Sequence, residues 1–140
     1  MTLTKFACIV LLTLGGGWGR VGQNTGSKAE AEDARSTIAG VWRGHSVCVD
    51  KNSPCHDEVN VYRFSRVAGR PNEFSVTASK VVDGKEIVMG SGAWKYDEKK
   101  RIVESEVPPI RLAIDGRKME GALNLADGTA YRRIYLEKQN

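Results

Sequence analysis

The sequence predicts an all-β protein that forms a single eight-stranded antiparallel up-and-down barrel. From residue 38 onward, aromatic and β-branched side chains alternate with polar ones, which is the period of a strand. Turn residues recur about every 10 to 15 residues, and no connection is long enough for a Greek-key crossover. Because an open meander of this length would expose an apolar face and two unpaired edges, we expect it to close.

The first four strands are expected at residues 38–49, 58–67, 73–82 and 86–96. A loop around Asn52-Ser53-Pro54 ends the first, and a polar loop at residues 68–72 ends the second. Asp83-Gly84 joins the third and fourth, since both residues tolerate the positive φ of a tight hairpin. Gly90 and Gly92 lie inside the fourth strand, where glycine is typical of a bend or bulge.

The last four strands are expected at residues 101–106, 110–114, 118–125 and 129–137. A charged turn at residues 97–100 precedes the fifth strand, and Pro108-Pro109 interrupts pairing after it. Asp115-Gly116 and Asp127-Gly128 supply the remaining two turns.

The N-terminal 37 residues have a different composition. Residues 1–19 combine Lys5, an apolar run and then small residues, the order typical of a secretory signal peptide. Residues 20–37 contain almost no large apolar side chain and predict a flexible linker, with a possible short helix at residues 28–35. The barrel domain then occupies residues 38–138, and we expect a secreted or periplasmic protein.

Cysteine content agrees with that compartment. Cys8 lies inside the apolar run and is expected to leave with the signal peptide, so Cys48 and Cys55 remain. A close pair of cysteines in an oxidising compartment usually forms a disulfide. Such a bond would fix a short loop, because closing so few residues contributes only about 2 to 3 kcal/mol.

Charge excludes one class of partner. The net charge is +4, from 21 basic and 17 acidic residues, and setting aside Lys5 and Arg20 leaves 19 basic residues against 17 acidic ones. The basic residues are spread along the chain and do not cluster with aromatics, so we expect no nucleic-acid partner. The apolar N-terminal run is too short for a stable membrane span.

Strand period also predicts which side chains face inward. The expected inward sets are Gly40, Trp42, Gly44, Ser46 and Cys48; Ile110, Leu112 and Ile114; Met119, Gly121, Leu123 and Leu125; and Ala130, Ile134 and Leu136. Arg132 shares the last of these faces, so it is a candidate interior arginine near the closing seam. Trp94 and Tyr96 are either core residues or part of an outer partner surface.

These residues resemble the lipocalin and wider calycin superfamily. The resemblance rests on Gly40-x-Trp42 in the first strand, the eight-strand meander and an arginine late in the last strand. It implies a barrel whose base is closed by Trp42 packed against Arg132, through a cation–π contact of about 0.5 to 2 kcal/mol. The chain lacks the family's C-terminal helix and long loops, so a roomy ligand cup is not implied.

A closer resemblance is to small secreted bacterial proteins of no established function. It is carried by Ser53-Pro54-Cys55, Asp57-Glu58, and the closing pattern from Met119-Glu120-Gly121 through Asp127-Gly128-Thr129 to Tyr131-Arg132. This resemblance implies the compartment and the barrel, and it implies no activity.

Catalytic and metal chemistry find little support in the motifs. His45, Cys48, Cys55 and His56 stand close together, but disulfide formation would remove both thiolates and no second cluster exists. The spacing of the cysteines is not Cys-x-x-Cys, and no Gly-x-Ser-x-Gly elbow is present. We therefore expect no enzyme, no metal and no cofactor.

The expected function is binding. The preferred ligand is a small apolar or amphipathic molecule, with Trp42, Lys80 and Arg132 as candidate binding residues, the last two for a carboxylate. The alternative is a protein-binding module, an inhibitor or an envelope accessory factor, that meets an extracytoplasmic partner through the disulfide loop or exposed aromatics. An internal cavity would favour the first, and a filled barrel with an aromatic surface patch the second.

Overall fold

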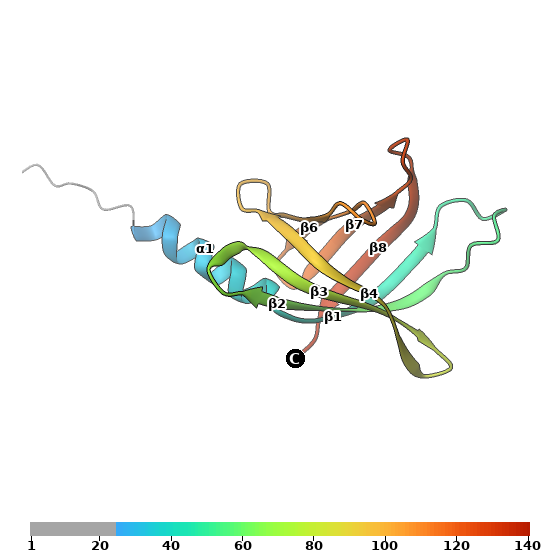
Figure 1. Ribbon diagram of the computed structural model, residues 1–140, viewed down its shortest axis with the longest axis horizontal. Coiled ribbons are helices and arrows are strands. Elements are labelled where there is room, and N and C mark those ends of the chain that lie inside the picture. Colours follow the sequence, from blue (N-terminus) through green and yellow to red (C-terminus); the bar gives the residue numbers. More distant parts are fainter. Residues whose placement is uncertain (1–24) are drawn as a thin grey trace, which may run out of the picture.

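The computed structural model describes residues 25–140 as one helix followed by a closed barrel of eight antiparallel strands, which confirms the predicted fold class (Figure 1). Each strand pairs with its neighbour in sequence, and β8 returns to pair with β1. The elements are α1 (Thr25–Ile38), β1 (Gly40–Cys48), β2 (Glu58–Val67), β3 (Arg70–Val82), β4 (Lys85–Asp97), β5 (Ile102–Ser105), β6 (Ile110–Asp115), β7 (Lys118–Asn124) and β8 (Ala130–Lys138). The expected signal peptide and residues 20–24 of the expected linker lie outside the described residues.

Residues 25–37 are helical, where the sequence predicted a linker with only a short helix. The segment contains three alanines and two glutamates, residue types that favour helix. Tertiary contacts stabilise it: Glu32 pairs with Arg66, Arg35 donates to Asn72 Oδ1 at 3.0 Å, and Ile38 is fully buried. Helix α1 therefore covers one end of the barrel (Figure 1). No helix within residues 25–140 has the length and apolar character needed to cross a membrane.

The barrel interior follows the predicted alternation. Its buried core is made by residues from α1 and all eight strands: Ile38, Trp42, Tyr62, Phe64, Phe74, Val76, Trp94, Tyr96, Val103, Ile110, Leu112, Met119, Ile134 and Leu136. Trp94 and Tyr96 are thus core residues, each 5% exposed, and no outer aromatic surface forms from them. Leu125 was expected inward, but β7 ends at Asn124 and Leu125 lies exposed in the following turn.

The covered end of the barrel is held by Trp42. Its indole Nε1 donates to the carbonyl oxygen of Ile38 at 2.8 Å, and its side chain is fully buried. The ammonium of Lys138 lies 5.3 Å from the centre of an indole ring and also donates to the carbonyls of Thr37 and Ala39. One lysine therefore joins the end of α1, the indole and the last strand.

The expected stacking of Arg132 on Trp42 is wrong. In the register of β1 and β8, Trp42 lies opposite Lys138, and Arg132 lies opposite Cys48. Six residues of strand separate those positions, or about 20 Å, so the arginine belongs to the other end of the barrel. Lys138 takes the place that the resemblance to lipocalins assigned to Arg132.

Two inward glycines lie where a side chain would collide with the backbone of an adjacent strand. A Cβ atom on Gly44 would lie 1.8 Å from the carbonyl oxygen of Tyr135 in β8. A Cβ on Gly121 would lie 1.8 Å from the carbonyl oxygen of Arg111 in β6. Both positions require glycine because the obstructing atoms are backbone, which has little freedom to move.

Loss of the Trp42 side chain should destabilise the whole barrel. We expect Trp42→Ala to lower the free energy of unfolding by about 3 to 5 kcal/mol, since it removes a fully buried aromatic. Chemical denaturation followed by circular dichroism measures the change. Tyr135→Ala is the control, because that side chain is 46% exposed and should change stability by less than about 1 kcal/mol. A neutral Trp42→Ala variant would contradict the role of the indole.

Candidate ligand-binding cavity

The end of the barrel opposite α1 contains a cavity of about 240 Å³. The loop between β1 and β2 and the β3–β4 hairpin lie at this end (Figure 1). Its walls come from seven strands and the β5–β6 loop: Ser46, Glu58, Asn60, Tyr62, Val76, Ala78, Met89, Gly90, Ser91, Gly92, Trp94, Val107, Pro108, Ile110, Leu123, Arg132 and Ile134. The lining is mainly apolar, with a few polar groups, the usual composition of a small-molecule site.

Aromatic side chains form the inner wall of the cavity. Tyr62 packs edge-on against Trp94 with ring centroids 5.7 Å apart, and Phe64 packs edge-on against Trp94 at 5.6 Å. Such contacts fix ring orientation and make the wall rigid. Burial, with a smaller effect from Glu58, raises the pKa of the Tyr62 phenol to about 12. The raised pKa means that burial in this apolar wall disfavours the phenolate.

A cluster of charged side chains lies beside this apolar volume. Arg132 Nη2 lies 3.6 Å from Glu58 Oε1, and Lys80 Nζ lies 3.9 Å from the same oxygen. Arg132 also donates to Ser46 Oγ at 3.4 Å, and its side chain is 12% exposed. Two cations thus share one carboxylate. The cluster of Arg132, Lys80 and Glu58 therefore has one positive charge in excess, and Arg132 and Glu58 line the cavity.

Asn60 adds a second polar feature. It is almost fully buried, and its Nδ2 donates to the carbonyl oxygen of Ser79 at 3.4 Å. Ser79 is buried too, and its hydroxyl has no hydrogen-bond partner within the described residues. Only Asn60 of these two residues lines the cavity.

The structure separates the three residues predicted to bind ligand. Arg132 lines the cavity, and Lys80 is joined to it through Glu58. Trp42 is at the covered end and does not line the cavity. The residues that sequence reasoning missed are Tyr62, Asn60, Met89 and the small residues of β4. Gly90 and Gly92 were expected to bend the strand, and their missing side chains also leave room beside the cavity.

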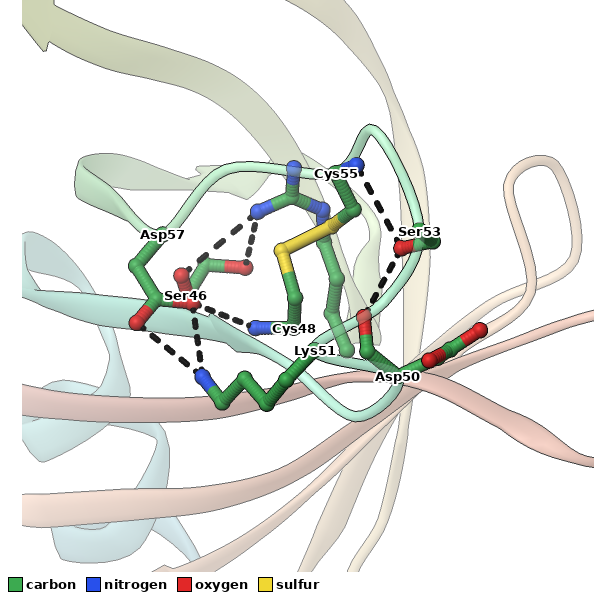
Figure 2. Close-up of polar contacts among 8 residues, drawn as sticks. Ser46, Cys48, Asp50, Lys51, Ser53, Cys55 and Asp57 are labelled. Carbon is green, nitrogen blue, oxygen red and sulfur yellow. Dashed lines mark hydrogen bonds and ion pairs between the residues drawn. A yellow bond between two sulfur atoms is a disulfide. The ribbon is translucent and has the colours of Figure 1, made fainter.

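A disulfide between Cys48 and Cys55 closes the loop at the rim of the cavity, with the two Cα atoms 6.0 Å apart (Figure 2). Within this loop the Asp50 carbonyl accepts from Ser53 Oγ at 2.8 Å, and Ser53 Oγ accepts from the Cys55 amide at 3.3 Å. Cys48 is buried at the end of β1, opposite Arg132 in β8. The disulfide therefore fixes the loop to the end of β1, beside the position of Arg132 in β8.

Asp57 completes the loop. Its Oδ1 accepts from the Cys48 amide at 2.8 Å and from Lys51 Nζ at 3.2 Å (Figure 2). The hydrogen bond from the Cys48 backbone, followed by that from Lys51, lowers the pKa of the Asp57 carboxyl below its ordinary value of 3.8. The ionised carboxylate is thus the form that ties the two ends of the loop together.

Histidines and metal ligands play no visible part in this cavity. His45 and His56 are both exposed, and neither lines the cavity. Residues 25–140 contain no group of three or more histidine, cysteine, aspartate or glutamate side chains placed to hold a metal ion.

A second hollow lies against α1. It measures about 750 Å³ and is more open to solvent than the cavity. Charged residues make up most of its lining: Lys28, Glu30, Arg35, Glu98, Lys99 and Arg101. Its size reflects this openness, and it offers less enclosed apolar surface for a ligand than the barrel interior does.

Comparisons with known proteins support the fold. No protein-family model matches the chain, and a search of curated proteins finds no match. Among solved structures, the chain is similar to a redesigned β-barrel, at 17% sequence identity and with a TM-score of 0.55. The match covers 76% of this chain and 96% of the designed one. Similarity at this level of identity concerns the architecture alone.

The rim loop should respond to acid through Asp57. A carboxyl whose pKa is lowered by folding stabilises the folded form above its ordinary pKa, and that contribution is lost as pH falls through the lower, folded value. We therefore expect the Cys48 amide to be protected from hydrogen exchange down to a pH near 3.8, and to lose protection below it. Amide exchange measured by NMR across an acid titration tests this.

Asp57→Asn provides the comparison, because its amide cannot be ionised. In this variant the Cys48 amide should show no acid-dependent step. An identical step in both proteins would mean that another group controls the loop.

Proposed function

We propose that this protein is a non-catalytic binding protein for a small amphipathic molecule, held in the cavity at the open end of the barrel. The observation that carries the proposal is a cavity of about 240 Å³ with apolar and aromatic walls and a charged cluster at one side. That volume lies just below the usual range of about 300 to 1,000 Å³ for drug-sized ligands, so the ligand is small.

The charged cluster supports a carboxylate as the polar group of this ligand. Arg132 and Lys80 together face the single carboxylate of Glu58, so a second carboxylate would balance the remaining charge. Arg132 is largely buried, which strengthens its attraction for an anion relative to a solvated arginine. An apolar tail would then lie against Tyr62 and Trp94, whose edge-on packing presents a continuous apolar wall.

We further propose that the protein acts outside the cytoplasm and is related to the lipocalins. The Cys48–Cys55 disulfide supports an oxidising compartment. The eight-strand meander and the buried Trp42 at one end support the relationship, with Lys138 as the cation at the indole. Native mass spectrometry of the chain purified from its host tests the compartment and the lipocalin-like binding role. The mass reports N-terminal cleavage, which indicates export, and it also reports any retained ligand. An uncleaved chain without bound ligand would count against both.

Filling the cavity should abolish binding without unfolding the barrel. A Cβ added at Gly92 meets no atom within 4 Å, so Gly92→Leu can place its side chain in the cavity. We expect octanoate to bind at least about tenfold more weakly to this variant, as measured by isothermal titration calorimetry. Ala93→Leu is the matched control, because its side chain points outward from the next position. Equal affinity in both variants would place the ligand elsewhere.

Arg132 should determine the preference for a carboxylate. We expect Arg132→Met, which keeps most of the side-chain volume, to weaken octanoate binding about tenfold or more, because the variant loses the buried cation. Binding of octanol, which has the same chain without the charge, should change much less. The two titrations, run on both proteins, measure the difference. An equal loss for acid and alcohol would show that Arg132 contributes only to packing.

A further inference from the structure

The β4 strand has a long unpaired edge. It spans Lys85–Asp97, but β5 pairs only with Lys95, Tyr96 and Asp97. Residues 85–94 therefore have β3 on one side and no strand on the other within the described chain. In an antiparallel ladder, alternate residues direct their N–H and C=O groups to opposite sides. About half of the backbone groups of this segment thus face solvent along the free edge.

Exposed apolar side chains gather at this edge. Ile87, Val88 and Met89 are 46%, 63% and 47% exposed, and Val107 in the β5–β6 loop is 90% exposed. The β3–β4 hairpin projects away from the barrel, which leaves the edge accessible (Figure 1). An edge of this length and apolarity is a template for another strand. No proline lies within residues 85–94 to block such pairing.

We propose that a second copy of this chain pairs with the β4 edge, strand against antiparallel strand, to form a two-fold symmetric dimer. The two sheets then continue into one another across the interface. A two-fold axis requires a surface that is complementary to itself, because each copy contributes the same residues. The sequence of β4 meets this requirement.

Side-chain size along β4 is self-complementary. Residues 85–89 carry the large side chains, Lys, Glu, Ile, Val and Met, and residues 90–93 are Gly, Ser, Gly and Ala. Antiparallel pairing about the middle of this segment places the large half of one copy against the small half of the other. Both charges, Lys85 and Glu86, lie in the large half, so neither faces a like charge on the opposing strand.

The irregularity in β4 coincides with the expected axis. Gly90 pairs with Ala78 and Val88 with Ser79, which leaves Met89 as an extra residue in the ladder. A bulge normally discourages pairing along an edge. Here it divides the edge into two regular segments of about equal length. Residues 85–88 of one copy then pair with residues 90–93 of the other, and the two bulges meet at the axis.

A dimer of this kind would also complete the cavity. Met89, Gly90, Ser91 and Gly92 line it on one side of the open seam, and Val107 and Pro108 line it on the other. A strand added to β4 would lie along this opening and reduce the access of water. The dimer is inferred from the free edge alone and does not rest on ligand binding.

Sedimentation velocity tests the proposal by measuring the oligomeric state over a range of protein concentrations. The protein is used in the form that its host accumulates, without added ligand. We expect a reversible monomer–dimer equilibrium. Hydrogen exchange of the residue 85–93 amides should slow as protein concentration rises, because backbone pairing protects them. Val88→Lys should weaken dimerisation about tenfold or more by placing a charge at the paired edge. The folded monomer should persist, since Val88 is an exposed residue.

Leu125→Lys is the matched control. Leu125 is 49% exposed, at the same end of the barrel but in the β7–β8 turn, away from the free edge. This variant should dimerise as the unchanged protein does. Equal weakening by both lysines would indicate general apolar association and would overturn the strand pairing. A protein that stays monomeric at every concentration would also overturn the proposal. The β4 edge would then remain free or pair with a strand of another protein.

Discussion

The fold depends on closing one end of the barrel around Trp42. Its fully buried indole donates to the carbonyl of Ile38, so the last turn of α1 becomes part of the core. Lys138 then joins the helix end, the indole and β8. This contact unites the first and last elements of the described chain at one end of the seam between β1 and β8.

The two ends of the barrel therefore have different chemistry. At the covered end, core side chains and α1 fill the interior. At the open end, Gly90, Gly92 and Ala78 are too small to fill it, and Arg132 and Glu58 bring charge to its wall, with Lys80 paired to Glu58. The short β5 strand adds a lateral opening beside β4. The cavity and the free edge thus lie side by side, because residues 89–92 of β4 line the cavity and have no strand paired on their other side within residues 25–140.

The period of the strands correctly predicted the inward faces of β1, β6 and β8 and most of that of β7, whereas the core residues of β2, β3 and β5 were not named in advance. Ser46, Cys48, Leu112 and Ile134 face inward as expected, because a half-buried strand repeats every two residues whatever its neighbours are. Arg132 was also placed inside for this reason. The prediction that Arg132 contacts Trp42 was wrong. The register between β1 and β8 decides which residues lie opposite one another, and this register cannot be read from one strand. The helix at residues 25–37 was only partly expected, because its stability comes from contacts with the barrel.

The amino-acid sequence by itself determined the number of strands, their order, the inward faces of β1, β6 and β8, and the pairing of Cys48 with Cys55, since these follow from local period, turn residues and a short covalent loop. Tertiary structure decided which cation meets Trp42, where the cavity lies and which strand edge stays open. These features depend on contacts between residues far apart in the chain, such as Trp42 with Lys138 and Glu58 with Arg132. Such contacts are fixed only when the eight strands close into a barrel of one particular register.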